Sequence, residues 1–260
     1  MTHPALAPIR SVGRAALALV RAVGQGGYLA GGAVRALKNV DIWAPHVLTQ
    51  MYKIGVASVP VALFVAMFTG IVLALQASNT LTGGVPEYFV GTLVGKSMIM
   101  ELGPVLTGLA LAGRVGASIA AELGTMRVTE QIDALETLAY DPLAYLVVPR
   151  VAAGILMFPV VVALAIAVGV VAGWLTSMSL LDVGSAQFVK GLKMFFDDFD
   201  VIFAMIKSVS FGLTVTGVGA FFGFQTKGGA EGVGHATTRT VVVSTMLILV
   251  LDAFWAAVLL

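Results

Sequence analysis

Residues 101–150 read ELGPVLTGLALAGRVGASIAAELGTMRVTEQIDALETLAYDPLAYLVVPR, and they decide which fold the sequence predicts. The stretch opens with a carboxylate, Glu101, inside an apolar run, where an ionisable side chain is costly. Gly103 and Pro104 follow at once, and a proline leaves one backbone carbonyl without its helical donor. A costly charge beside a broken helical ladder marks this segment as a candidate site inside a membrane span.

The next part of the stretch is a helix of small residues. Ala112, Gly116, Ala120 and Gly124 are four apart, so they share one helical face. That face carries almost no side-chain bulk, and another helix can approach it closely. Three GxxxG pairs elsewhere in the chain predict further close helix contacts: 91/95, 169/173 and 219/223.

The character of the stretch changes at Thr125, where it becomes polar and amphipathic until Asp141-Pro142. Acidic residues near the start favour a helix, and an apolar residue recurs every third position. A charged amphipathic helix between two spans, at about 129–141, is typical of a segment that docks a soluble partner. The residues that we expect to serve in this coupling are Arg127, Glu130, Asp133, Leu135 and Leu138.

Composition places the whole chain in a membrane. Of the 260 residues, 58% are hydrophobic and 11% are charged, against roughly 25% charged in an average soluble protein. The net charge of +1 indicates no nucleic-acid partner, and the absence of Cys excludes disulfides and thiol chemistry. We therefore expect an all-α integral membrane protein.

Hydropathy divides the chain into an N-terminal segment, 1–53, and a transmembrane domain, 54–260. We expect five spans, at about 54–76, 91–121, 147–178, 201–224 and 240–260. Within the N-terminal segment, the Arg residues of 10–38 share one face, which favours an interfacial helix interrupted at Gly24–Gly27 over a spanning helix. A polar elbow is expected at 39–53, and no cleavable signal peptide is apparent.

The Lys and Arg residues predict the orientation, because cytoplasmic segments carry the excess. Eleven fall on the side that includes the N-terminus and three on the other. The N-terminus and the 129–141 connector are therefore expected in the cytoplasm. The connector would then face the compartment that contains ATPases.

Catalytic motifs are weak. Gly95-Lys96-Ser97 resembles the end of a phosphate-binding loop, but position 90, which that pattern needs as Gly, is Val90. The three His residues have no ligand spacing, and we expect no metal site, no cofactor in this chain and no enzymatic activity of its own.

Three charges lie inside the expected spans: Glu101, Lys207 and Asp252. One interpretation is structural pairing, since an unpaired charge costs at least about 2.5–3.5 kcal/mol on insertion scales. The other is a polar patch in a substrate cavity. For Glu101 and Lys207 the two are compatible, whereas we expect Asp252 to be structural.

The sequence also resembles the MlaE/YrbE-type permeases of bacterial ABC lipid transporters. The strings ELGPV, AGRVGASIAAELGTMRVTEQIDALE, YDPL, PR, IKSV and ATTRTVV carry the resemblance in order, from about Tyr52 to the C-terminus. It implies a phospholipid permease in the bacterial inner membrane that works between inner and outer membranes. It further implies a homodimer, two copies of a separate ATPase that binds ATP, and a periplasmic MCE-domain partner.

The resemblance also implies a substrate pocket. The Glu of ELGP and the Lys of IKS, here Glu101 and Lys207, line or gate the lipid pocket in that family, and Val72, Leu73 and Gln76 match residues that approach the dimer axis. Met100 stands where the family carries Arg, so no cation carries over at that position. Two rival functions are an ion-coupled secondary transporter, which would show an inverted repeat that is not apparent, and a non-transporting scaffold, which would need no buried charges.

Overall fold

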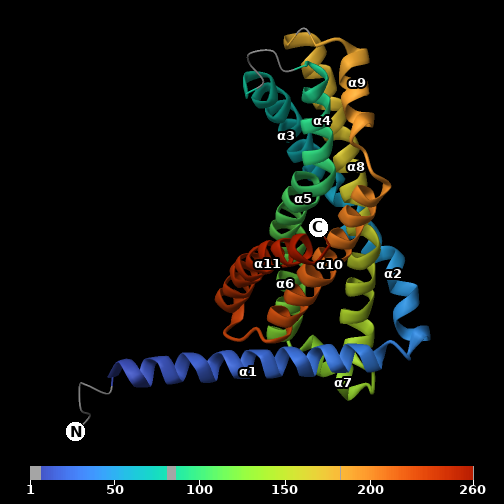
Figure 1. The fold of residues 1–260 in the computed structure, drawn as a ribbon. Coiled ribbons are helices and arrows are strands. Elements are labelled where there is room, and N and C mark those ends of the chain that lie inside the picture. Colours follow the sequence, from blue (N-terminus) through green and yellow to red (C-terminus); the bar gives the residue numbers. More distant parts are fainter. Residues whose placement is uncertain (1–6, 81–85, 182, 260) are drawn as a thin grey trace.

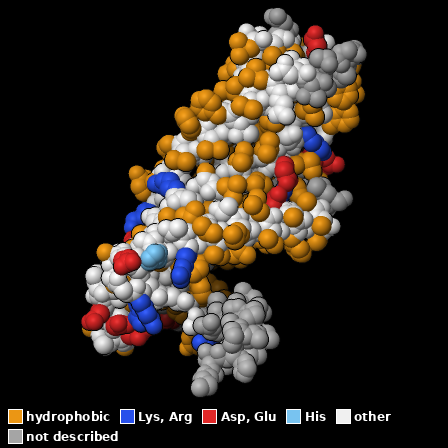
Figure 2. All heavy atoms as spheres, turned by 90° about the vertical axis from the view of Figure 1, so that its left-hand side faces the viewer, with side chains coloured by type: hydrophobic (Ala, Val, Ile, Leu, Met, Phe, Trp, Pro, Cys, Tyr) orange, Lys and Arg blue, Asp and Glu red, His pale blue; other side chains and the backbone are white. Residues whose placement is uncertain are grey.

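A computed structural model describes residues 7–80, 86–181 and 183–259, and every regular element in these ranges is helical. Five helical stretches are long and apolar enough to cross a membrane, as predicted: Val40–Asn79, Tyr88–Val128, Leu143–Leu180, Asp198–Phe224 and Gly229–Leu259. The predicted loop between the first two spans is partly outside the described residues. Hydrophobic side chains cover most of the visible surface, and charged ones gather toward its lower end (Figure 2).

The N-terminal segment differs from its prediction in two ways. Helix α1, Ala7–Ala36, runs through Gly24–Gly27 without interruption. The segment predicted as a polar elbow is a helix, α2, Val40–Ile54, because its apolar residues pack on the rest of the chain. Helix α1 lies across one end of the molecule, and its residues Leu29, Ala33 and Ala36 near its C-terminal end pack on the bundle (Figure 1). This transverse position is the one that an interfacial helix needs.

The first span continues as α3, Val59–Thr80, after a break at Gly55 and a short 3-10 turn, η2, Val56–Ser58. The second span is divided by two π-helical turns. Its parts are α4 (Tyr88–Ser97), η3 (Met98–Leu102), α5 (Gly103–Leu111), η4 (Ala112–Gly116) and α6 (Ala117–Val128).

The remaining elements complete the bundle. The connector helix α7 spans Gln131–Thr137, and a π-helical turn, η5 (Leu143–Val147), leads into α8 (Val148–Leu180). Helix α9, Ser185–Met194, lies at the end of the molecule opposite to α1 (Figure 1). Helices α10 (Asp198–Phe224) and α11 (Gly229–Leu259) follow. Asp197 caps α10 by accepting from the backbone N–H of Phe199.

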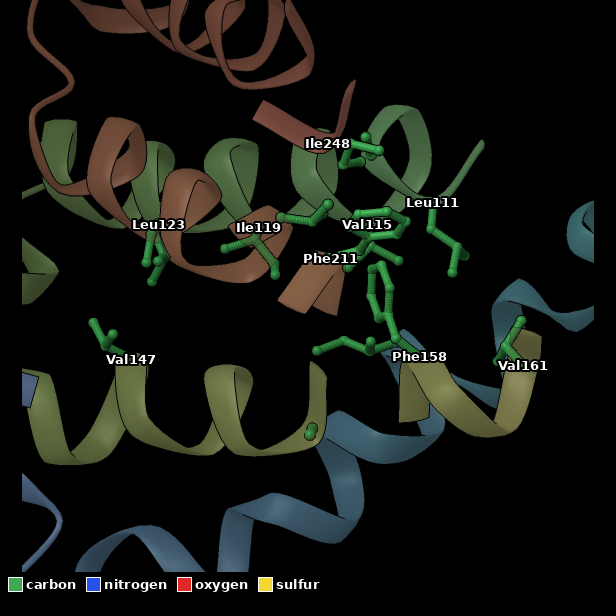
Figure 3. Packing of buried hydrophobic residues seen from close by; sticks show 14 of the residues in the cluster. Leu111, Val115, Ile119, Leu123, Val147, Phe158, Val161, Phe211 and Ile248 are labelled. Atoms are coloured by element: carbon green, nitrogen blue, oxygen red, sulfur yellow. The ribbon is translucent and has the colours of Figure 1, made fainter. Parts of the chain in front are cut away.

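The second span is the centre of the packing. Leu111, Val115, Ile119 and Leu123 project from it into the main core, where they meet side chains of α8, α10 and α11 (Figure 3). The partners labelled there include Phe158, Phe211 and Ile248.

The stripe of small residues allows another helix to approach closely, as predicted. Its four members are buried, and a Cβ added at Gly219 of α10 would lie 3.0 Å from the carbonyl oxygen of Gly116. The two backbones are therefore in close contact, as in small-residue helix pairs of membrane proteins.

A stability test follows from the contact of α3 with α8. A Cβ on Gly70 would lie 1.9 Å from the carbonyl oxygen of Gly169, whereas one on Gly217 would meet no described atom within 4 Å. We expect Gly70→Ala to lower the free energy of unfolding by about 1–3 kcal/mol through overpacking. Gly217→Ala, which makes the same chemical change in open space, should be neutral or slightly stabilising. Thermal unfolding in one detergent compares the two, and equal midpoints would contradict the close contact.

Candidate functional site

A buried ammonium group joins three helices within the membrane-spanning region. The Lys207 side chain of α10 is 0% exposed, and its Nζ lies 2.6 Å from Oε2 of Glu101 on η3. The same Nζ forms an ion pair with Asp252 of α11. The structure thus brings together Glu101 and Lys207, as predicted, and adds Asp252 as a second carboxylate. We call these three residues the Lys207 cluster.

Pro104 helps to place this cluster. It cannot donate a hydrogen bond to the carbonyl of Met100, four residues earlier. That carbonyl instead accepts a hydrogen bond from Lys207 Nζ at 3.2 Å. The Gly-Pro pair and the π-helical turn before it therefore supply both a carboxylate and a free carbonyl to one lysine.

The two carboxylates of the cluster differ in accessibility. The Glu101 side chain is 46% exposed, whereas that of Asp252 is 14% exposed. Asp252 is therefore positioned as the inner counter-charge of Lys207, in agreement with a structural role. Glu101 is the more accessible carboxylate of the two.

The predicted residues on α3 stand apart from this cluster. Val72 and Gln76 are exposed, and Leu73 packs on a second hydrophobic cluster together with Leu102, the neighbour of Glu101. The polar contacts described for Lys207 come from Met100, Glu101 and Asp252, none of which lies on α3. The predicted pocket is thus not enclosed within one described chain.

The connector differs from its prediction. Helix α7 is shorter than 129–141, and Ile132 is 1% exposed while Leu135 packs against the main core. The apolar stripe therefore contacts this chain as well, because the short helix folds back onto the bundle. Leu138, at 69% exposure, is the apolar residue that points outward.

An ion pair fixes the connector helix to the end of α6. Arg127 at the end of α6 pairs with Asp133 of α7. Glu130 begins α7 with a φ of 61°, which is a left-handed conformation uncommon for a residue other than glycine. Apart from Ile132 and Leu135, the residues of 129–140 remain exposed, so the connector presents a largely polar outer surface.

Sequence reasoning missed a second polar cluster, at the end of the molecule nearer α1. Glu122 of α6 accepts from Lys53 Nζ at 3.1 Å and lies 2.9 Å from Nη2 of Arg150. The Arg150 side chain is 4% exposed and donates to the carbonyl of Leu146 at 2.6 Å. From the sequence, Lys53 and Arg150 were used only to predict the orientation of the chain. The signal that they have a common partner was Glu122, a carboxylate inside the second span.

Two other candidates have ordinary explanations. Lys96, in the loop-like Gly-Lys-Ser string, lies within α4 and bonds both carboxylate oxygens of Asp200, at 2.7 and 2.8 Å. Among the described residues, no three His, Asp or Glu side chains gather in a way that could hold a metal ion.

Comparison with known proteins covers almost the whole chain. The family model described as Permease MlaE matches residues 47–258. A probable ABC transporter permease of Rickettsia felis is 40% identical over 92% of this chain and 93% of its own length. The intermembrane phospholipid transport system permease protein MlaE of Haemophilus influenzae is 35% identical over 96% of this chain and 97% of its own. The chain therefore belongs to the MlaE permease family.

Proposed function

We propose that this chain is the permease subunit of an ABC transporter that moves phospholipids between the inner and outer membranes. The observation that carries the proposal is the Lys207 cluster. It presents one accessible carboxylate of the second span beside the fully buried cation of α10. The relative from Haemophilus influenzae, whose name gives phospholipid transport, matches nearly end to end. A separate subunit would bind and hydrolyse ATP.

The chemistry of the cluster suits a head group that carries an ammonium group. Glu101 offers an accessible acceptor for that ammonium, while Lys207 is fully buried and holds the two carboxylates in place. The apolar surface around it would accommodate acyl chains. A polar end within an apolar pocket is the usual arrangement of a site for an amphiphile.

The assembly that we propose has two copies of the chain. One chain of this size does not enclose a lipid, and a two-fold axis is the commonest way to build a shared cavity. Two ATPase subunits would bind at the end that carries α7, and the Lys and Arg excess supports a cytoplasmic position for that end and for the N-terminus. An MCE-domain protein would bind at the periplasmic end, near α9.

The unequal exposure of the two carboxylates gives a test of the proposed substrate role. In Glu101→Gln, Lys207 keeps its inner partner, Asp252, so we expect nearly unchanged thermal stability. Lipid transfer should fall roughly ten- to hundredfold, as for the loss of one charged hydrogen bond worth about 1.5–3 kcal/mol. In Asp252→Asn the buried cation loses its inner counter-charge, so the unfolding midpoint should fall clearly.

Both variants are measured as reconstituted complexes, by ATP-dependent lipid transfer and by thermal unfolding. Glu101→Asp, which keeps the charge, should retain more transfer than Glu101→Gln. Normal transfer by Glu101→Gln would remove this carboxylate from the substrate site and leave the cluster with a structural role only.

The proposed dimer axis is tested by crosslinking in this Cys-free chain. Val72 is 56% exposed on α3, so a Cys there should crosslink copy to copy in native membranes. Leu156, at 52% exposure on α8, is the matched control and should not crosslink. Equal crosslinking at the two positions, or none at Val72, would place the axis elsewhere.

The proposed ATPase contact is tested at Leu138 rather than at Leu135, because the latter packs on the core. Leu138→Glu should release the ATPase in a pull-down while the permease stays folded in the membrane. Leu180→Glu, at 68% exposure at the end of α8, is the same change at the opposite end and should leave binding intact. Retention of the ATPase by Leu138→Glu would argue against docking through α7.

A further inference from the structure

Arg114 is a cation without a carboxylate partner inside the second span. Its Nη1 donates to the hydroxyl of Ser58 and, at 3.4 Å, to the carbonyl of Lys53, and both acceptors are neutral. The nearby carboxylate, Glu122, is already shared between Lys53 and Arg150. Among the described residues, Arg114 forms no ion pair. A guanidinium in a membrane span that lacks a counter-charge indicates a site for an anion.

The backbone around Arg114 is shaped to hold it. Arg114 lies on the π-helical turn η4, and opposite to it the break at Gly55 separates α2 from α3. The break exposes the Lys53 carbonyl to the guanidinium. Irregular backbone at the depth of a membrane is found where it is buried in protein or lines a cavity.

Such a cavity is present. It has a volume of about 230 Å³ and is lined by polar side chains that include Gln50, Lys53, Arg114, Ser118 and Glu122. Four of these residues also line a more open groove of about 760 Å³. Beyond the charged centre the groove is bordered by three apolar residues, Ala57, Ala121 and Met126, and by Tyr52, Thr125 and Gln131.

The charge and the depth of this cavity are those of a lipid head-group site. Two cations, Lys53 and Arg114, line the cavity beside one carboxylate, Glu122, which also pairs with Arg150, so positive charge is in excess. The 22 residues of α3 extend about 33 Å, close to the thickness of the hydrocarbon core, so its first residues lie near one interface. Basic pockets between membrane helices at this level bind phosphorylated head groups.

We propose that this cavity binds the phosphate group of a glycerophospholipid from the adjacent leaflet. Arg114 is the principal donor, because its fork of N–H groups matches phosphate oxygens, and Lys53 adds a second positive charge. Ala57, Ala121 and Met126 form the border along which the acyl chains leave the groove. The site shares no residue with the Lys207 cluster.

This position is separate from the proposed substrate site on the same span. Arg114 follows Glu101 by thirteen residues, or about 20 Å along a helix. A phospholipid bound here would occupy a second binding site, in the leaflet nearer α1 and α7. Its occupancy can be measured at equilibrium, so it is tested independently of whether the complex transports lipid.

The test uses a single cysteine at Ser118, which is exposed and lines both the cavity and the groove. The complex, labelled there with a small fluorophore, is placed in nanodiscs that contain phosphatidylcholine with a nitroxide on its head group. We expect saturable quenching that exceeds the quenching at a cysteine in place of Val242, a 46% exposed position on α11. Unlabelled phospholipid should reverse the excess, and diacylglycerol, which lacks the phosphate, should not.

Variants assign the excess quenching to the guanidinium. Arg114→Gln should raise the lipid concentration needed for half-maximal excess quenching roughly tenfold or more, and Arg114→Lys should raise it less. Arg239→Gln removes an exposed cation of α11 and should have no effect. If Arg114→Gln fails to assemble, Ala57→Phe, which narrows the groove and keeps every charge, should give the same loss.

Four results would overturn the proposal. The first is equal quenching at positions 118 and 242, and the second is excess quenching that survives both Arg114→Gln and Ala57→Phe. The third is reversal by inorganic phosphate at the concentrations effective for phospholipid, which would indicate a free-anion site. The fourth is excess quenching that the permease shows alone but loses in the assembled complex, which would assign the groove to a protein partner or to the second copy.

Discussion

The burial of one lysine constrains the centre of this protein. Lys207 is fully buried, and an ammonium group in that position is stable only with counter-charges at hand. The second span supplies one carboxylate and a free carbonyl, and α11 supplies the other carboxylate. Three helices are thereby held in one register. The close packing of the small-residue stripe against α10 maintains the same register toward the end that carries α7.

Three of the charged residues inside the spans lie on or beside irregular backbone. Each of the three π-helical turns adjoins such a residue: η3 contains Glu101, η4 contains Arg114, and η5 precedes Arg150. A π turn shifts the helical register by one residue and so redirects the side chains around it, and such turns are frequent at functional sites. The second span has two of them. It therefore serves as the element on which polar chemistry is placed, while α3, α8 and α10 supply the packed frame.

Much of the fold could be predicted from the sequence because membranes restrict the choices. Five spans, the close contact at Gly116 and the proximity of Glu101 and Lys207 follow from hydropathy, small-residue spacing and the cost of an unpaired charge. The continuity of α1 through Gly24–Gly27 and the helix at 40–54 could not, because tertiary packing overrides weak local signals. Nor did spacing show that Asp252 shares Lys207 with Glu101, or that Arg114 faces Lys53 across the Gly55 break, since both depend on which helices lie side by side.

The central claim is that the Lys207 cluster contacts the head group of a transported phospholipid. The most direct measurement places a photoreactive phospholipid, with its diazirine on the head group, in the reconstituted complex and maps the adducts by mass spectrometry. We predict adducts on residues 98–105 of the second span that are lost when unlabelled phospholipid is added in excess. Adducts confined to the exposed faces of α3, α8 and α11, with none on residues 98–105, would contradict the claim.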